Sequence, residues 1–138
     1  MASSDRRHAE ELLLIFGQLG ATITDALHAR VDPQFTSNVE VLVIVQLDLH
    51  GPQRPSDIAA LAGMTSGGVT KLLDRLEAHD LIARSYGLDR SDRRSATVEI
   101  TPEGRRLAGL LTEGLISRMD AVREALARIS KVVQPADD

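Results

Sequence analysis

Hydroxyl groups, glycines and a lysine are concentrated in residues 65–71, which read TSGGVTK. Hydroxyls and backbone N–H groups at a helix start bind phosphate oxygens, and glycine lets a backbone approach a ligand closely. If these residues begin the second helix of a helix-turn-helix, the pattern predicts a contact with DNA. The expected contact residues are Thr65, Ser66, Gly67, Gly68, Thr70, Lys71 and Arg75. Lys71 suits guanine O6 and N7, or phosphate alone. Lys71 and Arg75 also fit a solvated helix face paired with Asp74 and Glu77.

A second group of charges lies between Arg84 and Arg94, where four arginines and two aspartates give a net charge of +2. The whole chain has a net charge of −4, which argues mildly against nucleic-acid binding. Docking on phosphates depends on the local field, however. We therefore expect Arg90 and Arg93 to contact phosphates. The alternative is a charged hairpin that is polar for solubility.

The elements that position these charges follow one another from Arg54 to Gly104. Apolar spacing predicts a short helix from Pro55, closed by Gly63, and a second helix over about 65–79. The buried face of the second helix is expected to consist of Val69, Leu72, Leu73 and Leu76. Residues 81–86 and 96–100 are predicted strands joined by a polar hairpin. This order is typical of a winged helix-turn-helix, which places one helix in the major groove.

Helices are expected on both sides of this unit. Residues 5–30 have helical apolar spacing, and Asp32-Pro33 marks a break. The run VEVLVIVQLDL fits a helix or a buried strand, and we predict a helix because the motif that follows it expects one. Thr36 or Ser37 would cap this helix, and Gly51-Pro52 would end it. After Thr101-Pro102, apolar residues from Leu107 to Val133 recur at steps of 3 and 4, which predicts one helix of about seven turns. Its surplus length favours dimerisation through the terminal helices.

We thus predict a single domain over residues 1–138, mainly α with a small β-hairpin wing. Its parts are an N-terminal dimerisation helix (5–34), a winged helix-turn-helix region (35–101) and a C-terminal dimerisation helix (102–134). The recognition helix is expected at about 65–79 and the wing at about 82–100.

Two stretches, SDIAALAGMTSGGVTKLLDRLEAHDLIAR and DRSDRRSATVEITPEG, resemble the MarR family of bacterial transcriptional regulators. The resemblance implies a homodimer with two winged helices on successive major grooves of double-stranded DNA. It also implies a small-molecule pocket between the dimer and DNA-binding regions, and repression that the ligand relieves. By the same resemblance, Arg94 enters the minor groove and Asp92 fixes its pose by a salt bridge. An arginine suits that narrow, negative groove because its cation is weakly hydrated.

One departure concerns the C-terminus. The family usually has a further helix after the long one, and this chain stops near Val133, where that helix would begin. We therefore expect a smaller dimer contact, or a greater reliance on residues 5–30.

Several function classes are disfavoured. The chain has no cysteine, hence no disulfide and no thiolate sensor, and its four histidines are scattered, so no metal or other cofactor is expected. No apolar stretch approaches a membrane span, and the polar N-terminus does not resemble a signal peptide, which predicts a cytoplasmic protein. No nucleophile–base pair or phosphate-cradling loop indicates an enzyme. Ligand-binding residues are not identifiable.

The sequence therefore predicts a sequence-specific DNA-binding regulator, a homodimeric repressor of palindromic operators that a small-molecule ligand releases. The alternative is a winged-helix module that binds protein and not DNA. The net charge of −4 and the short C-terminus favour the alternative, and the Asp92-Arg93-Arg94 sequence of the wing disfavours it.

Overall fold

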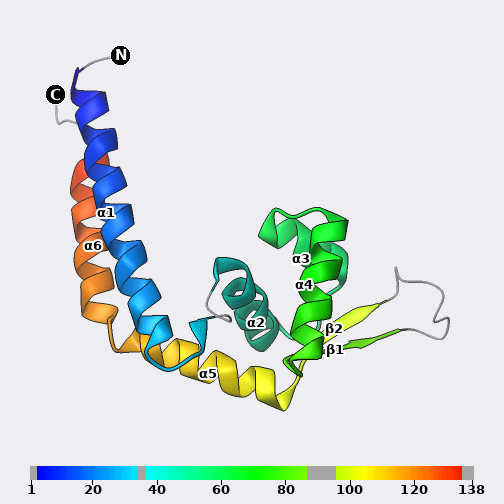
Figure 1. The fold of residues 1–138 in the computed structure, drawn as a ribbon. Helices are drawn as coiled ribbons and strands as arrows, with labels where there is room; N and C mark the ends of the chain where they lie inside the picture. The colour runs from blue at the N-terminus through cyan, green and yellow to red at the C-terminus, as the bar shows by residue number, and fades with distance from the viewer. Residues whose placement is uncertain (1–2, 34–36, 87–95, 135–138) are drawn as a thin grey trace. The chain divides into compact units, whose positions relative to one another are not determined.

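The computed structural model describes residues 3–33, 37–86 and 96–134. Within these ranges the chain forms six helices and one two-stranded antiparallel sheet (Figure 1). The elements are α1 (Ser3–His28), α2 (Asn38–His50), α3 (Pro55–Ala62), α4 (Ser66–Ala78), β1 (Ile82–Ser85), β2 (Thr97–Ile100), α5 (Pro102–Ile116) and α6 (Met119–Val133). The predicted fold class, mainly helical with a small hairpin sheet, is confirmed. None of the described helices is both long and apolar enough to cross a membrane.

The chain forms two compact units. One combines the residues up to Arg30 with those from Thr112 onward, and the other comprises Val31–Leu111. The boundary falls within α5, so the first ten residues of that helix belong to the second unit.

α2 begins and ends at local capping signals. The Ser37 hydroxyl accepts a hydrogen bond from the Glu40 N–H at 3.5 Å, and Gly51 closes the helix at a φ of 78°. The helix predicted for this β-branched run is confirmed. Val43, Ile44 and Leu47 are almost fully buried, which shows that packing outweighs the local preference for a strand.

α3 and α4 form a helix-turn-helix. Pro55 occupies the first turn of α3, and Gly63 ends that helix in the left-handed conformation with a φ of 63°, as predicted. Thr65 then caps α4 by accepting a hydrogen bond from the Gly68 N–H at 3.1 Å. The predicted apolar face of α4 is buried, and this burial fixes which side of the helix remains exposed. Its members are Val69, Leu72, Leu73 and Leu76.

The sheet lies directly after α4 in the chain. β1 and β2 pair with Ile82 opposite Ile100 and Arg84 opposite Val98, and both strands lie within one residue of their predicted bounds. Gln53, just before α3, adds a bridge to β2: its N–H donates to the Val98 carbonyl at 3.0 Å, and its carbonyl accepts from the Val98 N–H at 2.7 Å. The segment that leads into α3 is therefore hydrogen-bonded to the sheet.

The single C-terminal helix predicted over 102–134 is wrong. The chain forms α5 and α6 with a break at Ser117 and Arg118, where the Ser117 hydroxyl donates to the Gly114 carbonyl at 2.6 Å and the Arg118 N–H donates to the Leu115 carbonyl at 2.9 Å. The 3- and 4-residue apolar steps continue across this break, so periodicity alone did not reveal it. Because α6 follows α5, the expected lack of a further helix is also wrong.

In the unit formed by the two chain ends, α1 packs beside α6 (Figure 1). α1 ends at His28, before the predicted break at Asp32-Pro33. Its buried residues include Ile15, Ala26 and Leu27, and Ala125 is buried on α6. Polar links join distant segments of the unit: Arg30 pairs with Glu113 at 2.8 Å, and Arg128 donates to Gln18 at 3.0 Å. Several large apolar side chains remain exposed, namely Leu13, Leu14, Phe16, Ile116, Leu126 and Val133.

Gly114 is a test of the helix contact in this unit, because a Cβ at this position would overlap the Ala26 carbonyl oxygen. We expect Gly114→Ala to lower the free energy of unfolding by about 1–3 kcal/mol through overpacking. The matched control is Gly109→Ala on the same helix, where a Cβ meets nothing within 4 Å. It should be neutral or stabilising, since alanine favours a helix. Denaturant unfolding at one protein concentration measures both, and equal stability of the two variants would refute the close contact.

Candidate nucleic-acid interface

The N-terminal end of α4 presents most of the predicted contact residues together. Thr65, Ser66, Gly67, Thr70 and Lys71 are exposed, and Gly68 is half-buried. A Cβ at Gly67 would meet nothing within 4 Å, so the backbone there is open to an approaching ligand. Within the described part of the chain, Lys71 has no ion-pair partner. This end of the helix therefore combines a cation, hydroxyls and backbone N–H groups on an accessible surface. That it binds DNA stays a prediction.

The two threonines of this surface differ in whether the hydroxyl proton is already used in a hydrogen bond. The Thr70 hydroxyl donates to the Ser66 carbonyl at 2.9 Å, so its proton points along the helix. The Thr65 hydroxyl is an acceptor in the cap and keeps its own proton for another partner. Thr65 is therefore ready to donate to a phosphate, whereas Thr70 must first rotate.

Arg75 has a partner that the sequence did not indicate. Its guanidinium Nη1 lies 3.1 Å from Oε1 of Glu40 on α2, and the Glu40 side chain is only 5% exposed. Arg75 itself is 45% exposed, so the pair anchors α4 to α2 while one side of the arginine faces solvent. A lone acidic residue inside the apolar run VEVLV was the available signal for Glu40. DNA contact by Arg75 stays a prediction.

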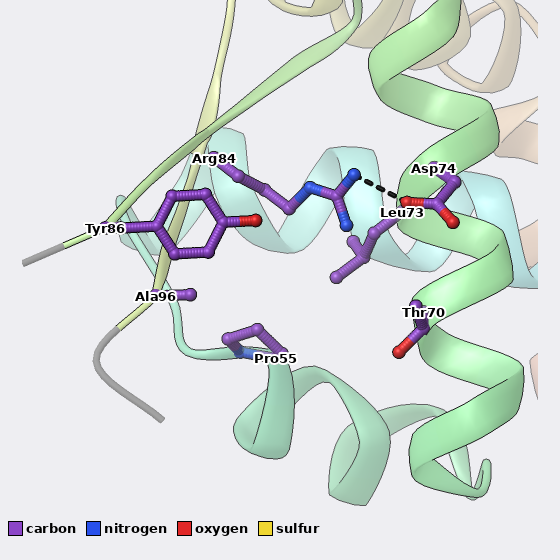
Figure 2. A pocket seen from close by; sticks show the side chains of 7 residues that line it. All are labelled: Pro55, Thr70, Leu73, Asp74, Arg84, Tyr86 and Ala96. Carbon is purple, nitrogen blue, oxygen red and sulfur yellow. Dashed lines mark hydrogen bonds and ion pairs between the residues drawn. The ribbon is translucent and has the colours of Figure 1, made fainter. Parts of the chain in front are cut away.

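Arg84 on β1 bridges two acidic residues of α4, Asp74 and Glu77, for which the sequence also allows Lys71 and Arg75 as partners. Its guanidinium lies 2.6 Å from Oδ1 of Asp74 and 2.5 Å from Oε2 of Glu77, and Figure 2 shows it directed at Asp74. Burial alone lowers the pKa of Arg84. The hydrogen bonds and charge attraction from the two carboxylates outweigh it, so that the pKa is raised above its ordinary value. This charge is therefore engaged within the protein.

A cavity of about 340 Å³ lies beside this arginine, between α3, α4 and the sheet (Figure 2). The lining mixes a cation and a carboxylate with aromatic and aliphatic surfaces. Its members are Pro55, Thr70, Leu73, Asp74, Arg84, Tyr86 and Ala96. A second hollow of about 440 Å³ lies where α3 and α4 begin, and Arg54, Ser56 and Ser66 contribute polar groups to it. The proposed contact surface is thus indented on both sides of Thr70.

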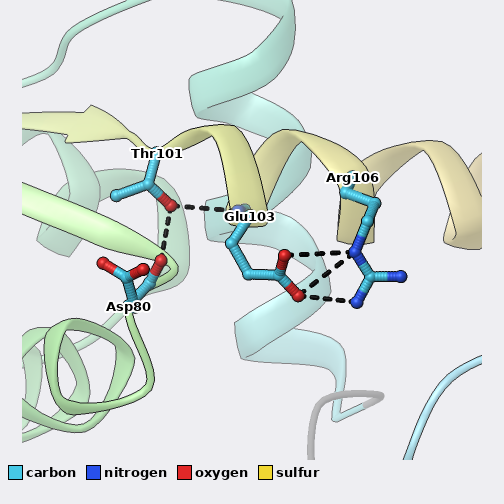
Figure 3. Close-up of polar contacts among 5 residues, drawn as sticks. Asp80, Thr101, Glu103 and Arg106 are labelled. Carbon is cyan, nitrogen blue, oxygen red and sulfur yellow. Dashed lines mark hydrogen bonds and ion pairs between the residues drawn. The ribbon is translucent and has the colours of Figure 1, made fainter.

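The C-terminal end of α4 is fixed by Thr101. Its hydroxyl donates to the Asp80 carbonyl at 2.5 Å and accepts from the Gly104 N–H at 3.0 Å (Figure 3). Asp80 has a φ of 60°, the conformation in which a glycine usually ends a helix. One turn into α5, the Arg106 side chain donates to Glu103, and this bond lowers the pKa of the carboxyl below its ordinary value. The two hydrogen bonds of Thr101 therefore fix the start of α5 against the end of α4.

The predicted wing contacts lie outside the described residues. This applies to Arg90, Arg93 and Arg94 and to Asp92, so their roles remain predictions. In the described ranges, no cluster of three or more histidine, aspartate or glutamate side chains is arranged to hold a metal ion.

Comparisons with known proteins agree with this geometry. The model of the MarR family matches residues 36–96. The HTH-type transcriptional regulator YfiV of Bacillus subtilis is 32% identical over 109 residues, which cover 70% of this chain and 67% of YfiV. The HTH-type transcriptional repressor MdtR of the same organism is 31% identical over 87 residues, which cover 57% of this chain and 55% of MdtR. The match thus spans about two thirds of one relative and just over half of the other.

Two solved structures show a similar fold. RV1404 from Mycobacterium tuberculosis superimposes with a TM-score of 0.70 at 20% identity, over 98% of each chain. BpsR of Bordetella bronchiseptica, whose DNA binding is regulated by 6-hydroxynicotinic acid, gives a TM-score of 0.56 at 22% identity, over 84% of this chain and 78% of BpsR.

The Arg75–Glu40 pair predicts a measurable loss of stability. Glu40→Gln removes the charge that holds Arg75 while keeping the shape of the side chain. Because Arg75 is partly solvated, we expect unfolding to become easier by about 1–2 kcal/mol, less than for a fully buried pair. Glu124→Gln, at an exposed position of α6, is the control and should change little. Thermal or denaturant unfolding decides; identical losses for both variants would show that the pair does not anchor α4.

Proposed function

Since this chain belongs to the MarR family of transcriptional regulators, we propose that it acts as a homodimeric repressor that binds a palindromic operator and leaves it when a small-molecule ligand binds. The observation that carries the proposal is the exposed start of α4. There a lysine, several hydroxyls and open glycine backbone lie on one surface of a helix-turn-helix whose opposite face is buried. The named relatives are transcriptional regulators, so we propose a role without catalysis.

The exposed apolar side chains of the terminal helices support the homodimer. Leu13 is 72% exposed, Leu14 66% and Phe16 55% on α1, and Leu126 on α6 is 55% exposed. Apolar surface of this kind is typical of a protein–protein contact. A second copy would cover it at the unit that does not carry α4, so both copies would keep their DNA-binding surfaces free. Two-fold symmetry of the dimer would then appear in the operator.

Contacts to DNA are proposed for the residues predicted from the sequence. Thr65, Ser66, Gly67 and Gly68 would bind phosphate at the start of α4, while Lys71 and Thr70 would reach further into the groove. Arg75, whose side chain is 45% exposed, would reach the DNA backbone. In the wing, Arg94 would enter the minor groove, Asp92 would orient it, and Arg90 and Arg93 would bind phosphates.

The test is a selection of random duplex DNA by the purified full chain at moderate salt, followed by sequencing of the bound pool. We expect a palindrome with half-sites about one helical turn apart. On that duplex, Lys71→Ala should bind more weakly, and the slope of log affinity against log salt should flatten by about one if Lys71 contacts phosphate. Lys131→Ala removes the same charge from α6 and should leave the slope unchanged.

A folded protein that enriches no sequence would remove the proposal. It would favour the alternative of a winged-helix module that binds protein. That alternative has lost one of its supports, because the C-terminal region contains both α5 and α6. The net charge of −4 remains in its favour.

Ligand-controlled release is tested on the same duplex. The regulation of BpsR by 6-hydroxynicotinic acid supports a small aromatic acid as the effector class. We expect at least one member of a panel of hydroxylated aromatic acids to weaken operator binding about tenfold, a usual size for coupling between two sites. Binding reciprocity requires the same compound to bind less tightly to the DNA complex, which calorimetry checks. If no acid in the panel changes affinity or melting temperature, this effector class is wrong.

A further inference from the structure

Arg84 joins β1, the strand that leads into the wing, to α4, the helix that carries the proposed DNA contacts. Its guanidinium contacts Asp74 and Glu77, which lie ten and seven residues before it in the chain, and its side chain is 19% exposed. A planar guanidinium can bind two carboxylates at once, which an ammonium does less well. The arginine thus holds β1 against α4 at two points, of which Figure 2 shows the contact with Asp74.

The two carboxylates lie close to the proposed contact surface. Asp74 is one helical turn from Thr70 and three residues from Lys71, and neighbours at these spacings share a helix face. Asp74 and Glu77 are 59% and 43% exposed at the side chain. Without a cation beside them, they would repel DNA phosphates. Arg84 supplies that cation from the side of the helix that packs on the sheet.

We propose that Arg84 is a positioning residue of the DNA interface. It fixes the strand that leads into the wing against α4 and offsets the charge of Asp74 and Glu77, and it does so without contacting DNA itself. The inference rests on the proposed function, because it concerns how the same surface accepts DNA.

A double-mutant cycle tests the inference on the selected duplex. The variants are Arg84→Gln, the double variant Asp74→Asn with Glu77→Gln, and the triple variant. We expect Arg84→Gln to weaken binding about tenfold in the wild-type background, because two uncompensated carboxylates then face the phosphates. In the background of the double variant, the same substitution should change affinity by less than about twofold. The salt slope should stay the same, because no phosphate contact is lost.

Controls separate this role from a general loss of charge or of folding. Arg105→Gln removes an equal charge from an exposed position of α5 and should have a much smaller effect. Circular dichroism and thermal unfolding report whether each variant is folded. Should Arg84→Gln fail to fold, Arg84→Lys takes its place, since it keeps the charge but not the two-point bridge; its weaker binding should likewise disappear in the double-variant background.

Three results would overturn the inference. Equal effects of Arg84→Gln in both backgrounds would show that it does not act through the two carboxylates. A salt slope flattened by about one would show that Arg84 binds phosphate directly. An equal loss for Arg105→Gln would reduce the effect to net charge. A wild-type chain that selects no duplex would remove the proposed function, and this inference with it, so the two failures are distinguishable.

Discussion

The burial of one face of α4 is the constraint on which the rest of the DNA-binding unit depends. Leu73 and Leu76 are almost fully buried, as are Ile58 of α3 and Val98 of β2 in the same unit. Because these apolar side chains occupy the core, the polar residues of α4 are directed outward. Hydrophobic packing thus decides which residues are available for binding, and hydrogen bonds and ion pairs then decide how the helix is oriented.

Electrostatics explains how an acidic protein can present a surface for DNA. The outward face of α4 holds Lys71, Asp74, Arg75 and Glu77, which cancel when counted along the sequence. In the structure their partners come from elsewhere: Glu40 engages Arg75, and Arg84 engages both acids. Lys71 is exposed, and no ion pair to it is found among the described residues. The arrangement of partners, and not the total charge, sets the field that a phosphate meets.

Local signals made most of the fold predictable. Pro55, Gly63 and Thr65 mark the helix-turn-helix by conformational preferences that hold in almost any context, and the alternation after Ala96 indicates a strand equally well. Even the β-branched α2 followed from its place before this motif. The break at Ser117 and Arg118 was not predictable in this way, because the apolar spacing is the same on both sides of it. A side-chain hydrogen bond and a tight turn decide it instead.

The exposed residues of the candidate site could be predicted from the sequence, but the ion pairs that hold α4 in place could not. The types and spacing of the hydroxyl residues, the glycines and Lys71 are enough to predict an exposed helix start that can bind phosphate. The partners of Glu40 and Arg84 lie on another helix or strand, so these ion pairs depend on how α2 and β1 pack against α4. An arginine counted as part of a basic patch proved to be neutralised by neighbours ten and seven residues before it.

The bridge between Gln53 and Val98 has a mechanical consequence. Two backbone hydrogen bonds fasten the segment before α3 to β2, while Arg84 fastens β1 to α4. The helix-turn-helix and the two described strands are therefore joined by contacts at both strands. A displacement of the sheet would have to break or carry along these contacts, so we expect α3, α4 and the two strands to move together. On binding, α4 and the strands would then approach DNA as one rigid unit.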